Sequence, residues 1–222
     1  MASSIIHYAI TCELIKRRQF NNPDRLKLGS ILVDVGFNGN SHMKISVAGG
    51  HKRTYDLEGF RNRYGKLMAE DDLYLGYYLH LIQDIIYRHF VYDKYHWNPS
   101  IPGNPERLHR DYAIGNFYVV GKYNLKNEVV IPEDFESEEI NQICSFDLER
   151  LVRDMDSYFV PVEDDEIFFF TKEMADEYIA EAVDYCSQEL DKLSAGEAGT
   201  DSYDFAWDSA PKSILESTMN TK

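Results

Sequence analysis

The sequence of 222 residues contains few cysteines, no long apolar run and no recognisable secretion signal. Its three cysteines, Cys12, Cys144 and Cys186, lie far apart and form no Cys-x-x-Cys pair, so neither a disulfide framework nor a thiolate zinc site is expected. No stretch approaches the roughly 18 apolar residues that a membrane span requires. The N-terminus also lacks a basic segment followed by an apolar one. We therefore expect a protein that remains in the reducing cytoplasm.

Basic residues are scarce relative to acidic ones. The chain has 23 Lys and Arg against 38 Asp and Glu, a formal net charge of −15. Such a surface repels long polyanions and anionic lipids, so we expect neither duplex nucleic acid binding nor stable membrane association. A small anionic substrate remains compatible with this charge if a bound divalent cation makes the site locally positive.

Apolar residues recur mainly at helical spacing, which predicts an all-α, multi-helix domain. The composition, 44% apolar, is sufficient for a folded core. Residues 29–36 are the ambiguous segment, where a short strand competes with a helix. After Leu193 the composition changes to small and polar residues, so we expect one helical domain over 1–193 and a flexible tail over 194–222. The first expected helix begins at Ser3 or Ser4, and a short second one runs from Pro23 to Gly29. Further helices are expected over about 57–68, 73–92, 108–119, 140–155 and 175–193, the last with Thr171 as a candidate cap.

The predicted helix over 73–92 carries the clearest chemical signal. His80 and Asp84 are four residues apart, which places both side chains on one face, at a spacing that can hold one metal ion. The helix is apolar nearly all round, so these two ionisable groups should be buried and need partners. The alternative is a hydrogen-bonded histidine–aspartate pair without a metal.

Three further residues are candidate ligands. His7 lies beside the apolar face of the first helix, Asp34 follows an apolar run, and His42 lies in a Gly/Asn/Ser loop. Each alone is compatible with a structural or exposed role. Together with His80 and Asp84 they would form a nitrogen and oxygen ligand set of the type that zinc, manganese or iron accepts.

The order of these motifs resembles that of the bacterial zinc-dependent phospholipase C-like hydrolases and, more remotely, of secreted phospholipase C and the fungal single-strand nucleases. The resemblance covers about residues 1–123, and its most specific part is the Gly-Tyr-Tyr-x-His-x-x-x-Asp segment that ends at Asp84. It implies a compact all-helical fold that holds one or two zinc ions. It also implies hydrolysis of a phosphoester, for which we expect a small soluble substrate, by an activated water.

Residue by residue, the resemblance implies ligand roles for five positions, with Asp84 bridging two ions and Asp34 also acting as the base. These positions are His7, Asp34, His42, His80 and Asp84. The chain departs from the secreted phospholipases because it lacks a later His-x-x-x-Glu element, and His89 is one residue from the expected place of a further histidine. Asp111 is the candidate late ligand instead. His51, next to two basic residues, competes with His42 as the loop ligand.

Other metal and nucleotide enzymes fit less well. The chain has no adjacent His-Asp dipeptide, a single Glu-x-x-His element at Glu106 and His109, no phosphate-binding glycine loop and no Gly-x-Ser-x-Gly motif. The second hypothesis is of a different class. It is a non-catalytic helical protein that uses the same ligands as a structural metal site, or an interaction scaffold that uses its acidic surface.

Overall fold

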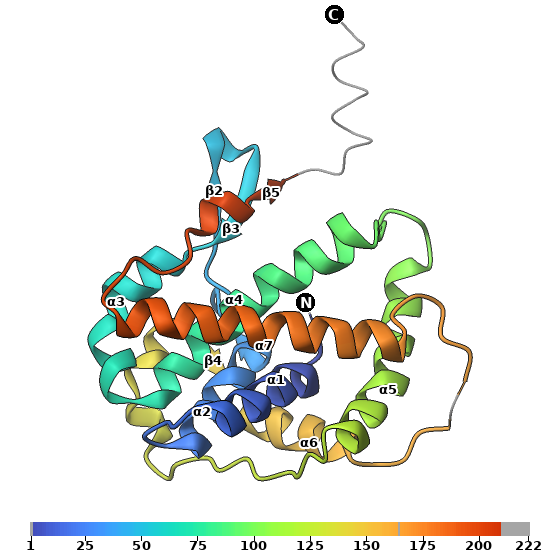
Figure 1. The fold of residues 1–222 in the computed structure, drawn as a ribbon, viewed down its shortest axis with the longest axis horizontal. Coiled ribbons are helices and arrows are strands. Elements are labelled where there is room, and N and C mark those ends of the chain that lie inside the picture. The colour runs from blue at the N-terminus through green and yellow to red at the C-terminus, as the bar shows by residue number, and fades with distance from the viewer. Residues whose placement is uncertain (1, 164, 210–222) are drawn as a thin grey trace, which may run out of the picture.

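The computed structural model describes residues 2–163 and 165–209 and shows a mostly helical domain. Its long C-terminal helix, α7, packs across α1, α4 and α5, while α2 and α3 lie against α4 (Figure 1). The α-helices of the described residues are α1 Ser4–Arg17, α2 Pro23–Leu32, α3 Leu57–Glu70, α4 Asp72–Arg88, α5 Asn104–Lys122, α6 Leu148–Tyr158 and α7 Lys172–Ser194.

The domain is not purely all-α, because two small antiparallel sheets accompany the helices. Strands β2 (Lys44–Val47) and β3 (Lys52–Tyr55) form a hairpin, and β5 (Trp207–Asp208) adds to β3. The second sheet pairs β1 (Gly36–Phe37) with β4 (Ser145–Phe146). Both sheets join segments far apart in the sequence, which is why local periodicity did not predict them. The hairpin projects above the helices in Figure 1.

Helix α2 begins at a cap encoded in the sequence and is longer than predicted. The Asn22 side chain accepts a hydrogen bond from the Arg25 backbone N–H, and Pro23 occupies the first turn, where its missing N–H is harmless. The helix continues past the predicted end at Gly29 to Leu32, followed by the 3₁₀ turn η1 (Val33–Val35). The ambiguous segment is therefore helical almost to its end, and this turn carries Asp34.

Two glycines allow α2 and α4 to lie against each other. A Cβ atom on Gly29 would be 2.9 Å from the Tyr77 backbone nitrogen, and one on Gly76 would be 3.0 Å from the Ser30 nitrogen. Larger residues at these positions would push the helices apart, because real Cβ contacts are longer. This close contact brings the backbone of Ser30 beside His80.

Helix α4 is the central element, as predicted. It is buried along nearly its whole length and starts at the Asp71 side chain, which accepts from the Leu73 N–H. Aromatic rings pack around it, for example Phe60 of α3 stacked at 5.3 Å on Tyr77. The helix continues into a π-helical turn over His89–Lys94. Because α4 is fixed on all sides, the side chains that it directs inward have defined positions.

The described residues of the C-terminal segment pack on the helical domain. Helix α7 begins at the predicted Thr171 cap and ends at Ser194. The residues that follow, to 209, then pack back on the domain. The N–H and hydroxyl of Thr200 donate to the buried Glu189 carboxylate at 2.8–3.0 Å, and the Thr54 hydroxyl donates to the Ser202 carbonyl at 2.6 Å. The buried Glu189 carboxylate thus holds the polar segment that follows α7 on the domain. Residues 210–222 of the predicted tail lie outside the described residues.

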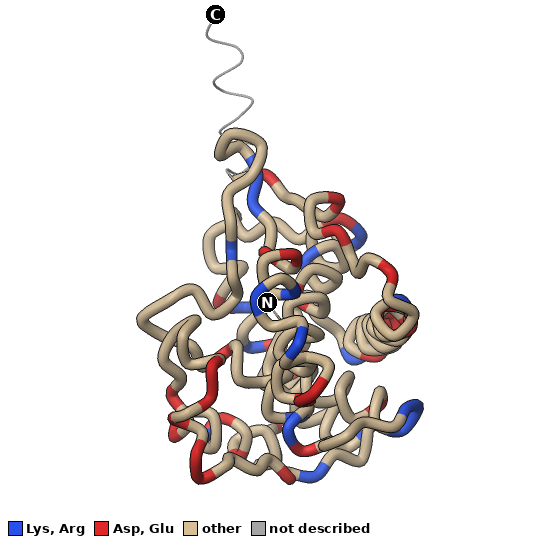
Figure 2. Tube along the Cα trace, turned by 90° about the vertical axis from the view of Figure 1, so that its left-hand side faces the viewer, with Lys and Arg blue, Asp and Glu red and all other residues tan. Residues whose placement is uncertain are grey.

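Charge is distributed unevenly over the surface. Figure 2 shows acidic residues over the outer loops, with basic residues in the hairpin at the top, where β2 and β3 carry Lys44, Lys52 and Arg53. None of the helices described has both the length and the apolar character needed to cross a membrane.

Candidate metal centre

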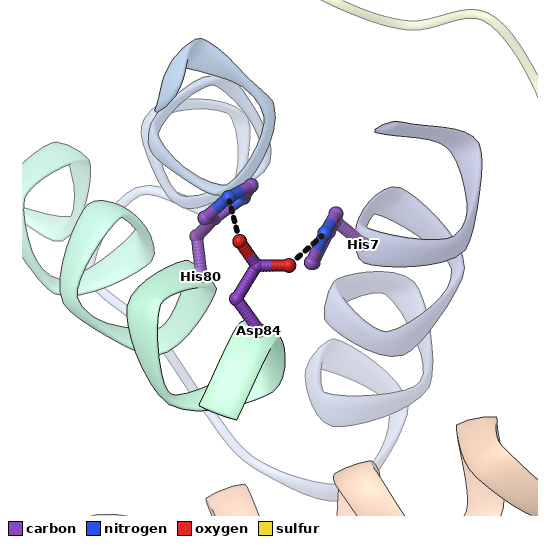
Figure 3. Close-up of side chains that lie close together, drawn as sticks. All are labelled: His7, His80 and Asp84. Carbon is purple, nitrogen blue, oxygen red and sulfur yellow. Dashed lines mark ion pairs between the residues drawn. The ribbon is translucent and has the colours of Figure 1, made fainter. Parts of the chain in front are cut away.

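Five of the six predicted ligands converge on one point inside the domain. Each comes from the expected motif. The histidine Nε2 atoms lie 3.4–3.8 Å from the carboxylate oxygens of the two aspartates in five nitrogen–oxygen pairs. The five are His7 from α1, Asp34 from η1, His42 from the loop before β2, and His80 and Asp84 from α4. Figure 3 shows the Asp84 carboxylate between the rings of His80 and His7.

The nitrogen–oxygen separations in the cluster are longer than hydrogen bonds and would suit ligands of a shared metal ion. All five nitrogen–oxygen distances, 3.4–3.8 Å, exceed the range of N–H···O bonds. Two ligands of a tetrahedral zinc, each about 2.0–2.1 Å from the ion, are about 3.3 Å apart. Within the described residues, the Nε2 atoms of the three histidines and both oxygens of Asp84 are buried without any hydrogen-bond partner. Such atoms are costly to bury unless something binds them.

The other ring nitrogens are held by neighbouring polar groups. Nδ1 of His80 donates to the Ser30 carbonyl at 2.7 Å, because that carbonyl can only accept. Nδ1 of His7 lies 2.8 Å from Oε1 of Gln83, and Nδ1 of His42 lies 3.0 Å from the Ser41 hydroxyl. A proton on Nδ1 leaves the lone pair on Nε2, which then serves as the ligand atom. This arrangement of supporting groups is typical of metal-binding histidines.

The two carboxylates are both held in the ionised form. Burial raises the pKa of Asp34, but the neighbouring imidazoles, His80 first, outweigh burial and lower the pKa to about 2. Burial likewise raises the pKa of Asp84, while His7 and His80 hold it well below its usual range. The Ser4 hydroxyl donates to Oδ2 of Asp34 at 2.8 Å. Oδ1 of Asp34 is thereby left to face the histidines.

The cluster contains two overlapping sets of ligands. The first is His7, His80 and Asp84, and the second is Asp34, His42 and His80. His80 has only Nε2 available, so it can bind one ion at a time. Asp84 reaches both sets, because Oδ1 faces His7 at 3.5 Å and Oδ2 faces His42 at 3.4 Å. The geometry therefore accommodates one ion, or two ions that share the Asp84 carboxylate.

The cluster is buried, and two of its residues lie nearer the surface than the other three. The side chains of His7, His80 and Asp84 are 0% exposed, whereas those of His42 and Asp34 are 10% and 13% exposed. His42 and Asp34 therefore form the side of the cluster nearest the solvent, although Nε2 of His42 is itself buried. Catalytic metal sites keep one position open to substrate, while fully closed sites are typical of structural metals.

The structure does not bring Asp111 into the cluster. Its oxygens accept from the backbone N–H groups of Phe168, Phe169 and Phe170 at 2.7–2.9 Å, so this buried acid holds the loop before α7. Its ligand role is not supported, because these three bonds already satisfy the carboxylate. Of the rival histidines, His51 is exposed at the hairpin turn, and His89 pairs with Asp93.

The sequence prediction missed the residues that support the ligands. They are Ser4, Ser30, Ser41 and Gln83, each bonded to a predicted ligand. Gln83 was detectable, since it is a polar residue inside an otherwise apolar helix, one position before Asp84. The serines were not, because their contribution depends on backbone position or on contacts between distant segments.

Comparisons of the chain with protein-family models, with curated proteins and with solved structures found no match.

Proposed function

We propose that this protein is a metal-dependent hydrolase of phosphoric esters, with zinc as the first candidate metal. One or two ions would be held by His7, Asp34, His42, His80 and Asp84. The observation that carries the proposal is the set of buried, unpartnered ligand atoms that face one another at 3.4–3.8 Å. A hydrogen-bonded histidine–aspartate pair without a metal would show shorter contacts and satisfied atoms.

A divalent cation in this set would supply hydroxide near neutral pH and offset the charge of a phosphoryl group. Within the chain, Asp34 suits the role of base because it lies nearer the surface than His7, His80 and Asp84 and is ionised at neutral pH. The Ser4 hydroxyl fixes one of its oxygens, which orients the other toward the cluster. Burial lowers the pKa of His42, so its ring is neutral and available as a ligand.

We extend the proposal to the fold. The order of the motifs along the chain and the central position of α4 support a relation to the phospholipase C-like hydrolases. The strands of the two small sheets are not part of the helices that carry His7, His80 and Asp84. Their presence is therefore compatible with a relation to the phospholipase C-like hydrolases.

The test combines elemental analysis with assays on a panel of phosphomonoesters and phosphodiesters. The purified protein is expected to contain zinc or another divalent metal and to hydrolyse at least one ester class. Asp34→Asn should lower the rate by about 100-fold or more, the usual contribution of a general base. It should keep its helix content and the ion held by His7, His80 and Asp84. A metal-free protein that does not take up zinc, or equal rates in the variant and the wild type, would refute the proposal.

One observation favours a second candidate, a structural metal site without catalysis. His7, His80 and Asp84 are 0% exposed, as in sites that only stabilise a fold. In that case zinc raises the melting temperature, but neither the wild type nor Asp34→Asn hydrolyses any ester of the panel.

A further inference from the structure

Arg88 lies on the same helix face as two of the metal ligands. It is the last residue of α4, four residues after Asp84 and eight after His80. Residues at this spacing follow one another along one face, one turn apart. The helix that carries the metal ligands thus ends in a positive charge on their side.

Two aromatic rings hold the Arg88 side chain. Its guanidinium carbon is 4.4 Å from the ring centre of Tyr92 and 4.4 Å from that of Trp207. Trp207 comes from β5, which pairs with β3, so the C-terminal segment positions this contact. Arg88 also donates a side-chain hydrogen bond to Tyr92, and stacking leaves the remaining N–H donors in the guanidinium plane available for another acceptor.

Arg88 has no acidic partner. Within the described ranges, no carboxylate forms an ion pair with it, and its Nε atom is buried without a hydrogen-bond acceptor. The nearby Asp93 is paired with His89. Burial lowers the pKa of Arg88, which is the expected effect of a cation with too few counter-charges. In a chain with a net charge of −15, an arginine that forms no ion pair among the described residues is a candidate anion-binding residue.

A series of contacting aromatic rings connects Arg88 to His42 of the candidate metal centre. The ring of Tyr55 is 6.2 Å from that of His42 and 5.2 Å from that of Trp207, which contacts Arg88. These contacts thus run from His42 to the guanidinium.

Charge balance indicates what binds between them. With one divalent cation in place, Asp34 and Asp84 neutralise it, and Arg88 adds a positive charge beside the cluster. We propose that Arg88 is a substrate-binding residue that donates hydrogen bonds to a phosphate oxygen of a ligand bound on the His42 side of the centre. This inference rests on the proposed function, because without a cation the two carboxylates repel the same phosphate.

The test measures the affinity of inorganic phosphate for the zinc-loaded protein by calorimetry, after zinc stoichiometry has been determined. Arg88→Gln should weaken phosphate binding by about 10- to 100-fold, the loss of a charge-assisted hydrogen bond. Arg88→Lys should bind about threefold or more weaker than wild type, since a lysine keeps the charge but not the planar donor pair. Arg107→Gln is the matched control, because that arginine also stacks on a ring, 4.5 Å from the centre of Phe168, and is exposed. Its phosphate affinity should be unchanged.

The outcomes separate the two proposals. Unchanged zinc content with equal phosphate affinity in the wild type and Arg88→Gln overturns the role of Arg88 and leaves the metal centre intact. A wild-type protein that takes up no zinc refutes the proposed function, and this inference with it. If Arg88→Gln does not fold, the phosphate affinity of Arg88→Lys is the deciding measurement. Wild-type phosphate affinity in Arg88→Lys would then overturn the proposed role of Arg88.

Discussion

Replacement of Asp84 by asparagine changes one atom and removes one charge at the centre of the ligand cluster. The side chain is buried, and neither of its oxygens has a hydrogen-bond partner among the described residues. Its oxygens face His7 at 3.5 Å and His42 at 3.4 Å. Asn has nearly the same shape, so packing is conserved while the shared carboxylate ligand is lost. The variant therefore isolates the contribution of one ligand to metal binding.

The expected effect can be worked out from the number of ligands. Zinc sites with four protein ligands bind with about 10–16 kcal/mol, so one ligand contributes about 3 kcal/mol, or about 100-fold in affinity. At a free zinc concentration of about 100 times the wild-type Kd, the wild type gains about 2.7 kcal/mol and the variant about 0.4 kcal/mol. For a domain of this size, these gains raise the melting temperature by roughly 5–11 °C and 1–2 °C.

The assay is thermal unfolding followed by circular dichroism, in a chelator and then in buffered zinc. Only the shift caused by zinc is compared, so a change in the stability of the metal-free variant does not affect the result. Asp111→Asn is the matched control, a buried aspartate bonded to the N–H groups of residues 168–170. It should unfold at a lower temperature under both conditions and keep the full zinc shift. A full shift in Asp84→Asn, or its loss in Asp111→Asn, would show that the ligand assignment is wrong.

Two further variants test the support of the site. Gln83→Leu removes the hydrogen-bond partner of Nδ1 of His7 and should weaken zinc binding about 10- to 100-fold. The zinc affinity is measured by competition with a chromophoric chelator. Wild-type affinity in this variant would show that the contact does not orient the His7 ring. Gly76→Ala places a Cβ atom against the backbone of α2 near Ser30 and should destabilise the domain by about 1–3 kcal/mol, measured by urea unfolding. Gly65 has open space around it, so Gly65→Ala should instead stabilise the domain by up to about 1 kcal/mol. Equal effects of the two glycine variants would contradict the close contact of α2 and α4.

The part of the site that the sequence predicted is the part encoded by helical periodicity. His80 and Asp84 share a face of α4 because they are four residues apart, and the apolar residues around them predict burial. His7, Asp34 and His42 could be proposed because their motifs resemble those of a metal-dependent family in order and spacing. The structure brings all three to the same point, but their distances could not be derived from periodicity alone.

The rest depends on contacts between distant segments. Asp111 has the side chain of a metal ligand, yet its position on α5 directs it to the backbone at residues 168–170. The segment after α7 has the composition of a flexible tail, yet one buried acid, Glu189, binds Thr200 and holds that segment on the domain. In both cases hydrogen bonds from backbone N–H groups to a buried carboxylate decide the structure, and the residue types alone do not predict these bonds.

The same segment connects the fold to the site. Because Glu189 holds Thr200, the chain continues to β5, where Trp207 pairs across from Arg53 and contacts Arg88. The Arg88 guanidinium therefore owes its position to a residue more than a hundred positions later in the chain. A site that served only to stabilise the helices would need the five candidate ligands but no ordered cation beside them. Arg88 follows His80 and Asp84 along one face of α4, which agrees better with the proposed binding of an anion at this site than with a purely structural role.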